Sequence, residues 1–177
     1  MIQTYFIRSA TLTDVPRLPD VELAAATLYL SQLAVTGLTA EILSEPNSIE
    51  DFAAAQQADR LWVAANEANE PIGFALLDEI DQWLYLDELD VLPEYGRRGI
   101  GTALVKHVCQ LAREAGYPGV TLSTFRDVIW NAPFYGRLGF QIVPPHEQTP
   151  GLQALVASEK ERGLHIDKRV IMSYRFT

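Results

Sequence analysis

The chain has 177 residues, of which 48% are hydrophobic and 21% are charged, a balance typical of one globular domain rather than of a disordered segment. Its formal net charge of −9 weighs against nucleic-acid binding, since little would neutralise phosphates, and mildly favours a small cationic partner. Cys109 is the only cysteine, so neither an intrachain disulfide nor a cysteine metal cluster can form.

The sequence shows no sign of export or of membrane insertion. The first eight residues contain no basic region that leads into a long apolar run, as a signal peptide would. No apolar run reaches the roughly 20 residues that a membrane-spanning helix needs. We therefore expect a cytoplasmic protein without a membrane partner.

The first half of the chain predicts a strand, two helices and then three neighbouring strands. In chain order these elements cover residues 2–8, 21–30, 48–57, 61–65, 72–77 and 83–91. Thr13 and Asp14 are candidate caps for the first helix, and Ser48, with Asp51 three residues later, is the candidate cap of the second. Because only short polar turns separate the three strands, we expect an antiparallel meander.

The second half predicts a long helix, a strand, a short helix and two further strands. These elements cover residues 100–115, 120–124, 134–138, 140–143 and 169–176. Apolar residues recur at spacings of three and four along the long helix, and Gly116 is placed to end it. Residues 35–48 and the segment that begins at Pro144 are expected to be mainly loop. The pattern predicts one mixed α/β domain over residues 1–177.

The most informative segment joins the last strand of the meander to the long helix. It reads Leu89-Asp90-Val91-Leu92-Pro93-Glu94-Tyr95-Gly96-Arg97-Arg98-Gly99-Ile100-Gly101-Thr102. A helix N-terminus has unpaired N–H groups and a partial positive charge, so it can bind phosphate. Gly99 and Gly101 let a pyrophosphate approach the backbone, and Arg97 and Arg98 add positive charge. The spacing matches neither a P-loop nor a dinucleotide fold, and the alternative is a turn that only packs tightly.

This segment resembles the coenzyme motif of the GNAT superfamily of acyl-CoA-dependent N-acetyltransferases, Gln/Arg-x-x-Gly-x-Gly/Ala. Gly96 stands where the family has Gln or Arg, so the resemblance implies weaker side-chain assistance with backbone binding retained. It also implies a GNAT-like fold, in which helices flank a mostly antiparallel sheet of about six to seven strands. Acetyl-CoA is then expected to contact the following residues: Leu89, Asp90, Val91, Arg97, Arg98, Gly99, Ile100, Gly101 and Thr102.

A second motif of the same family is a short helix with the pattern Phe/Leu-Tyr-x-x-x-Gly-Phe. The chain matches it fully with Phe134-Tyr135-Gly136-Arg137-Leu138-Gly139-Phe140. The resemblance implies that Tyr135 protonates the departing coenzyme thiolate and that Phe134 and Asn131 lie beside the coenzyme. The alternatives are that Tyr135 is a core residue whose hydroxyl bonds to the backbone, and that Asn131 is the N-cap of the short helix.

Amine acylation requires a neutral amine, whereas lysine-type amines have pKa values of about 10.4, so a base or a water chain must remove a proton. The strand before the glycine-rich turn carries Asp87, Glu88 and Asp90. Strand alternation puts Asp87 on one face and the other two on the opposite face, unless a bulge intervenes. In polyamine-acting members of the resembled family, acidic residues at positions 87 and 88 contact the amine. We expect Glu88 to be the base, with Asp87 second, although solvent-facing charges are the alternative.

The expected reaction is direct attack of a small, cationic primary amine on acetyl-CoA within a ternary complex. The pantetheine arm would lie along residues 89–91 like an added strand, and a backbone N–H near Val91 would stabilise the oxyanion. The three histidines have no metal-ligand spacing, so no metal is expected. A non-catalytic CoA-binding protein and an enzyme with a longer acyl donor or a hydroxyl acceptor are the rivals. Residues 20–60 and 144–168 would form the acceptor mouth, and homodimerisation stays open.

Overall fold

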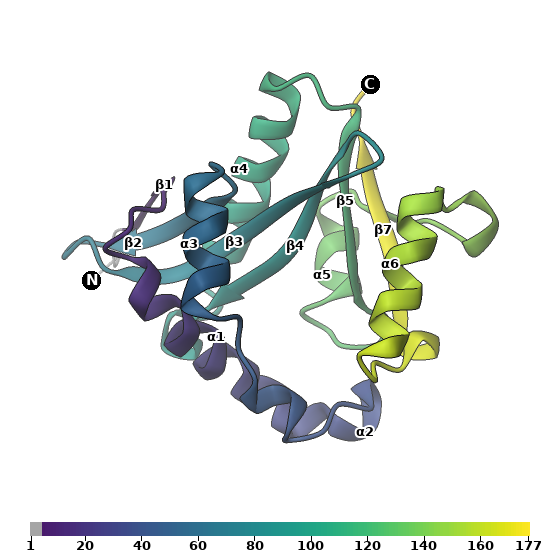
Figure 1. Ribbon diagram of the computed structural model, residues 1–177, viewed down its shortest axis with the longest axis horizontal. Coiled ribbons are helices and arrows are strands. Elements are labelled where there is room, and N and C mark those ends of the chain that lie inside the picture. The colour runs from purple at the N-terminus through teal and green to yellow at the C-terminus, as the bar shows by residue number, and fades with distance from the viewer. Residues whose placement is uncertain (1–4) are drawn as a thin grey trace.

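Seven strands form one twisted sheet in the computed structural model, which describes residues 5–177 (Figure 1). The strands are β1 (Tyr5–Ser9), β2 (Leu61–Asn66), β3 (Pro71–Ile80), β4 (Trp83–Val91), β5 (Gly119–Phe125), β6 (Gln141–Ile142) and β7 (Arg169–Arg175). Their order in the sheet is β1-β2-β3-β4-β5-β7-β6, and only β4 and β5 run parallel. This confirms the predicted mostly antiparallel sheet and its meander.

Helices cover both faces of the sheet (Figure 1). The α-helices are α1 (Leu18–Ala26), α2 (Leu33–Thr36), α3 (Ile49–Gln57), α4 (Ile100–Glu114), α5 (Ala132–Arg137) and α6 (Pro150–Glu161). Short 3-10 turns are η1 (Val15–Arg17), η2 (Thr27–Gln32), η3 (Ile42–Ser44), η4 (Pro93–Tyr95), η5 (Pro145–Glu147) and η6 (Ile166–Lys168). α4 and α5 lie on one face, whereas α1, α3 and α6 lie on the other.

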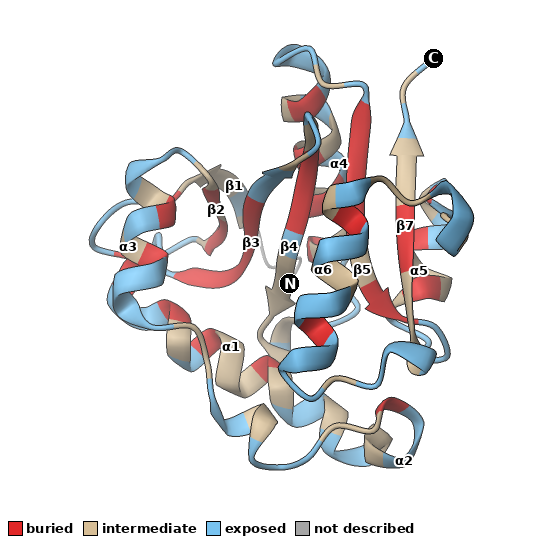
Figure 2. Ribbon diagram, turned by 45° about the vertical axis from the view of Figure 1, so that its right-hand side comes forward, coloured by how far each residue is buried: buried red, intermediate tan, exposed pale blue. Residues whose placement is uncertain are grey.

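The core consists of two clusters, one on each face. The apolar stripe of α4, with Leu104, Val105 and Val108 fully buried, packs on the central strands, as Figure 2 shows. On the opposite face α1 and α3 pack against β2 and β3, where the rings of Phe52 and Phe74 meet edge to face at 5.2 Å. β4 contributes Leu84, Leu86 and Leu89 to the first cluster, and α1 contacts this strand from the other face.

The caps of two helices follow their sequence signals. Ser48 accepts a hydrogen bond from the N–H of Asp51 at 3.1 Å, and the Asp51 carboxylate accepts one from the N–H of Ser48, which completes a capping box. Gly116 follows α4 with φ of +82°, a conformation that favours glycine. Both predicted helix boundaries are confirmed.

Three sequence predictions were wrong in part. The segment after Pro144 contains the twelve-residue helix α6, which the loop prediction missed because few of its residues form a buried apolar stripe. Asp14 does not cap a helix, since its carboxylate instead binds Arg8 at 2.6 and 2.9 Å. The first helix begins at Leu18 and continues as η2 rather than spanning residues 21–30. Residues 2–4 of the first predicted strand lie outside the described residues.

Candidate active site

The glycine-rich turn presents backbone donors at the N-terminus of α4. Within residues 5–177, the N–H groups of Ile100, Gly101 and Thr102 donate to no other group, and the first bond of the helix runs from Ala103 to the carbonyl of Gly99 at 2.9 Å. Gly99 has φ of +82°, and so turns the chain into the helix. A fifteen-residue helix with open first-turn donors is suited to bind a phosphate.

The two arginines of the turn differ in their surroundings. Arg98 donates to the carbonyl of Glu94 at 2.7 Å and lies over the ring of Tyr95 at 5.3 Å, so it stiffens the turn. Arg97 is exposed and adopts a positive φ of +58°. Its guanidinium forms no hydrogen bond or ion pair with a described residue, and so remains available to an anion.

β4 has an open edge next to this turn. It pairs with β5 only over Leu84–Leu86, after which the two parallel strands separate. Residues 89–91 therefore pair with β3 alone and leave backbone groups unpaired on the β5 side. A Cβ at Gly101 would lie 3.7 Å from Phe134 and 4.0 Å from Leu89, so the open edge, α4 and α5 meet there. Leu89, Gly101 and Phe134, three of the residues expected to contact the coenzyme, are therefore neighbours.

Tyr135 lies in α5 with its ring packed among aromatic side chains. Only 7% of the residue is exposed, and the rings of Phe134 and Phe140 contact it edge-on at 5.0 and 5.7 Å. Among the described residues, none is hydrogen-bonded to its hydroxyl, so the backbone-bonded alternative does not apply. Burial raises the pKa of Tyr135, and the neighbouring Tyr29 and Asp90 add to the shift. The phenol therefore stays protonated at neutral pH.

A bulge decides where the carboxylates of β4 point. Leu76 pairs with Glu88 and Leu77 with Leu86, which leaves Asp87 without a partner on β3. Leu86 and Leu89 both pack into the α4 cluster, so the two residues between them project from the other face. Asp87 and Glu88 therefore share one face, contrary to simple alternation.

Glu88 and Asp90 belong to a cluster of three carboxylates that is joined by an amide. Asn47 donates from Nδ2 to Glu88 at 2.6 Å and to Glu22 at 3.2 Å, and its backbone N–H donates to Glu22 at 3.0 Å. These carboxylates line a cavity of about 220 Å³ together with Tyr29 and the apolar residues Leu23, Ala26, Leu38, Ile42 and Leu43. The cavity thus combines carboxyl groups on one part of its wall with apolar side chains on the rest.

Asp87 is exposed and does not line this cavity, although its charge contributes to the raised pKa values of Glu22 and Glu88. The charged groups that act on it are Asp78, Arg162 and Glu159, of which the last two belong to or follow α6. Glu22, Tyr29 and Asn47 lie within residues 20–60, which the sequence predicted as part of the acceptor mouth without singling out any of the three. No spacing signal could have found them, because they reach β4 from a distant part of the chain.

Removal from water raises the pKa values of the carboxylates in the cluster. Burial raises the pKa of Asp90 to about 7, and the charge of Glu22 adds to the shift. Burial also raises the pKa of Glu88 well above its ordinary value, with further contributions from Asp90 and Glu22. Two adjacent carboxyl groups of this kind hold a shared proton near neutral pH and release it as one unit.

We expect Asp90→Asn to stabilise the protein at pH 8 and to have little effect on stability at pH 4. The raised pKa means that the folded state keeps a proton that the unfolded chain loses, so the wild type loses stability as the pH rises from about 4 to about 7. The melting temperature at pH 8 should rise by about 2–4 °C, equivalent to roughly 1 kcal/mol. Scanning calorimetry at both pH values measures it, with the exposed Glu67→Gln as control. An equal rise in melting temperature at pH 4 and pH 8 would contradict the link between the Asp90 proton and stability.

Asn131 directs its side chain away from the helix that it precedes. Its Nδ2 donates to Thr124 at 2.8 Å and to the Tyr29 hydroxyl at 3.0 Å, and its Oδ1 lies 3.1 Å from that hydroxyl. The side chain makes no capping hydrogen bond to α5. Asn131 is thus the N-cap residue of α5 by position, as one alternative expected, but its side chain does not cap the helix and instead links β5 and α5 to η2.

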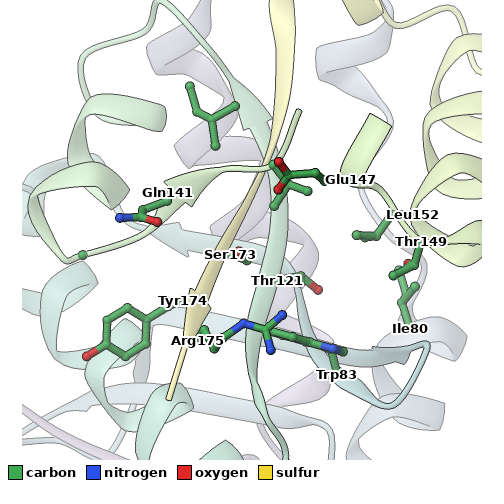
Figure 3. A pocket seen from close by; sticks show the side chains of 13 residues that line it. Ile80, Trp83, Thr121, Gln141, Glu147, Thr149, Leu152, Ser173, Tyr174 and Arg175 are labelled. Atoms are coloured by element: carbon green, nitrogen blue, oxygen red, sulfur yellow. The ribbon is translucent and has the colours of Figure 1, made fainter. Parts of the chain in front are cut away.

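A larger cavity of about 390 Å³ lies between the β5–β7–β6 part of the sheet and the start of α6. Figure 3 shows Thr121, Ser173 and Arg175 on its wall. Its walls include Glu147, Thr149 and Leu152, which belong to the part of the expected acceptor mouth at residues 144–168, but none of the residues expected to bind the coenzyme or to act as the base. In the part of the chain that the structure covers, no group of three or more His, Cys, Asp or Glu residues is placed to hold a metal ion. None of the helices in that part combines the length and the apolar character needed to cross a membrane.

Comparisons with known proteins agree with this arrangement. The model of the acetyltransferase (GNAT) family matches residues 28–140. A peptidyl-lysine N-acetyltransferase, YjaB of Salmonella typhimurium, is 34% identical over 82 residues, which cover 46% of this chain and 50% of the relative. Streptothricin acetyltransferase of Streptomyces lavendulae is 28% identical over 157 residues, covering 77% of this chain and 82% of the relative. The chain thus spans about half the length of the YjaB relative that it matches.

Solved structures show the same fold at low sequence identity. The PaiA N-acetyltransferase of Thermoplasma acidophilum, solved in complex with coenzyme A, has a TM-score of 0.71 at 20% identity over 98% of this chain and 99% of that one. The ribosomal-protein-S18-alanine N-acetyltransferase of Escherichia coli has a TM-score of 0.65 at 19% identity over 98% of this chain and 95% of that one. The element order and sheet topology are therefore shared along nearly the whole chain.

Proposed function

The chain belongs to the GNAT family of acetyltransferases, and from this premise we propose that it transfers the acetyl group of acetyl-CoA to a primary amine of a small cationic acceptor. The observation that carries the proposal is the position of the cavity lined by Glu22, Glu88 and Asp90, on the same strand that borders the open edge and the phosphate-binding turn. A cation can thus be held next to a bound coenzyme. Both named curated relatives acetylate an amine-bearing molecule, a lysine side chain or an antibiotic, which supports this class of acceptor.

The turn at residues 97–102 and the open edge of β4 at residues 89–91 fit the coenzyme in chemistry and in space. The open N–H groups of residues 100–102 and the guanidinium of Arg97 suit a pyrophosphate, and Gly99 and Gly101 leave room for it. The unpaired edge at residues 89–91 can hydrogen-bond the amide groups of a pantetheine arm, with Phe134 beside it. The bound coenzyme would supply an activated acetyl thioester.

The remaining steps are proton transfers by this chain. The Glu88–Asp90 pair orients the ammonium and accepts its proton, which leaves a neutral nucleophile. A backbone N–H near Val91 stabilises the oxyanion as the new C–N bond forms. Tyr135 donates its proton to the sulfur as the C–S bond breaks, the nitrogen releases its second proton to solvent to give the amide, and exchange with solvent restores the carboxylate pair and the phenol. The exposed Asp87 shares the face of Glu88 but does not line the cavity, and it has no role in this scheme.

Calorimetric titration with acetyl-CoA tests the coenzyme, with NADH and ATP as controls. We expect selective, saturable binding of acetyl-CoA. Turnover is then measured on a panel of 1,4-diaminobutane, Nα-acetyl-lysine amide, kanamycin and glutamate, with thiol release as the readout. Turnover of a cationic member and none of glutamate supports the proposal. Coenzyme binding without turnover of any amine would favour the non-catalytic CoA-binding alternative, and no binding would reject the proposal.

The variant Gly101→Ala should lose coenzyme affinity without losing stability. A Cβ at this position meets its nearest protein atoms only at 3.7 and 4.0 Å, which is ordinary contact, and alanine favours the helix over glycine. The methyl group would, however, occupy the space that a pyrophosphate needs. We expect the Kd for acetyl-CoA to rise by about 10-fold or more, measured by calorimetry, with an unchanged or higher melting temperature.

Gly136→Ala is the matched control for this variant. It also places a methyl group on a helical glycine, and no atom lies within 4 Å of the added Cβ. Its Kd should equal that of the wild type. Unchanged affinity in Gly101→Ala would show that the phosphate does not lie against this turn.

A further inference from the structure

The segment between α1 and α3, residues 27–48, forms a strap across the amine cavity. Figure 1 shows it passing below the sheet from α1 to α2, and then returning to α3. It supplies more than half of the residues that line the cavity, namely Tyr29, Leu38, Ile42, Leu43, Glu45 and Pro46. The position of this strap therefore sets the shape of the acceptor site.

Polar contacts tie the strap to the rest of the molecule at three places. At its middle, Lys168 donates to the carbonyls of Ala34 and Val35 at 2.9 and 3.1 Å. At its end, Asn47 joins the strap to the carboxylates of Glu22 and Glu88. At its start, Tyr29 reaches Asn131 at the beginning of α5.

The contact between Tyr29 and Asn131 is the one that connects the acceptor side to the helix of Tyr135. The ring of Tyr29 packs against Phe125 at 5.7 Å and Trp130 at 5.8 Å, so the side chain is fixed by aromatic contacts as well as by hydrogen bonds. Both ends of the Asn131 amide are engaged, because Oδ1 and Nδ2 meet the Tyr29 hydroxyl and Nδ2 also donates to Thr124. Little hydrogen-bonding capacity of this amide is left for another ligand.

We propose that Asn131 works on the acceptor side of the site, as a latch with Tyr29 that holds the strap over the amine cavity, rather than as a ligand of the pantetheine arm. This inference rests on the proposed acetyl transfer. The two latch residues position the cavity wall opposite Glu88 and Asp90, so that the amine meets the carboxylates in one orientation. Loss of the latch should weaken the amine site and leave the coenzyme site intact.

The test measures amine and coenzyme constants separately in Tyr29→Phe and Asn131→Ala. Tyr29→Phe keeps the aromatic packing and removes only the hydroxyl. We expect KM for the fastest amine of the panel above to rise about five-fold in each variant, as the loss of one hydrogen bond predicts. The calorimetric Kd for acetyl-CoA and kcat should change by less than about two-fold. The double variant should resemble Asn131→Ala, because both substitutions break the same contact.

Hydrogen exchange measured by mass spectrometry gives a readout that needs no acceptor. In both variants the amides of residues 27–36 should exchange faster, and those at the N-terminus of α4 should not. Tyr117→Phe is the matched control, since it removes a tyrosine hydroxyl that is bonded to Glu79 at 2.7 Å, far from the strap in the fold. A higher Kd for acetyl-CoA with unchanged KM for the amine would overturn the latch and make Asn131 a coenzyme residue. Failure of the wild type to bind acetyl-CoA would instead reject the proposed function itself.

Discussion

Replacement of Tyr135 by phenylalanine is expected to lower kcat by about 100-fold or more, in the range of general acid catalysis, with little change in the Kd for acetyl-CoA. The hydroxyl has no hydrogen-bonding partner among residues 5–177, and burial keeps it protonated. Single-turnover measurement of thiol release at saturating amine gives the effect on the chemical step.

Tyr174→Phe provides the comparison for this variant. Tyr174 belongs to the same aromatic cluster and packs on Phe140 at 5.6 Å, so its substitution tests the loss of a nearby hydroxyl. We expect both variants to melt near the wild-type temperature and only Tyr135→Phe to lose turnover. A Tyr135→Phe enzyme with wild-type kcat would assign thiolate protonation to water.

Local sequence patterns predicted the parts of the site that lie on continuous stretches of chain. The strand, turn and helix from Leu89 to Thr102 supply glycines, a capping position and an apolar stripe, each readable from neighbouring residues. The Tyr135 motif is equally local. In both places the structure has the predicted element with the predicted side chains, because short-range preferences and tertiary packing agree there.

The acceptor side was beyond local patterns for a physical reason. Tyr29 and Asn131 are 102 positions apart, and neither lies in a periodic segment that indicates its partner. Asn47 stands in what the sequence indicates as a loop, and its link to Glu88 depends on how the strap folds back. Long-range polar contacts of this kind carry no periodicity in sequence.

The bulge on β4 shows how one unpaired residue changes an assignment. Period-two alternation would have separated Asp87 from Glu88, whereas the extra residue places both on the face away from α4. Position in the sheet then separates them, because Glu88 meets Glu22 and Asn47 while Asp87 meets the charges near α6. The sequence favoured Glu88 and Asp87 as the carboxylates that meet the amine. The structure instead brings Glu88 together with Asp90.

The pH dependence of kcat/KM should reveal the carboxylate pair directly. Because burial raises the pKa of Asp90 to about 7 and also raises that of Glu88, the pair retains a proton below neutral pH and cannot accept another from the amine. We expect kcat/KM of the wild type to rise with pH through an apparent pKa near 7. In Asp90→Asn the negative charge that raises the pKa of Glu88 is gone, so the rise of kcat/KM should occur at lower pH than in the wild type.

Glu88→Gln should remove most of the activity, together with the rise of kcat/KM that has an apparent pKa near 7. The amide cannot accept the proton, and we expect kcat/KM at pH 8 to fall by about 100-fold or more, while calorimetric affinity for acetyl-CoA is retained. Glutamine has nearly the same shape and can keep a contact with Asn47, so the fold should persist. Residual activity should then increase with pH in proportion to the free neutral amine, since the substrate alone would supply the deprotonated form.

Asp87→Asn distinguishes between the two candidate bases. If Asp87 were the base, its substitution would cause the large loss and Glu88→Gln would keep the wild-type pH profile. The geometry favours the opposite result, because Glu88 lines the amine cavity and Asp87 is exposed near α6. A large loss in both variants would mean that the amine contacts both carboxylates across the bulge, and the acceptor would then have to extend from the cavity toward Arg162. The comparison therefore locates the amine as well as the base.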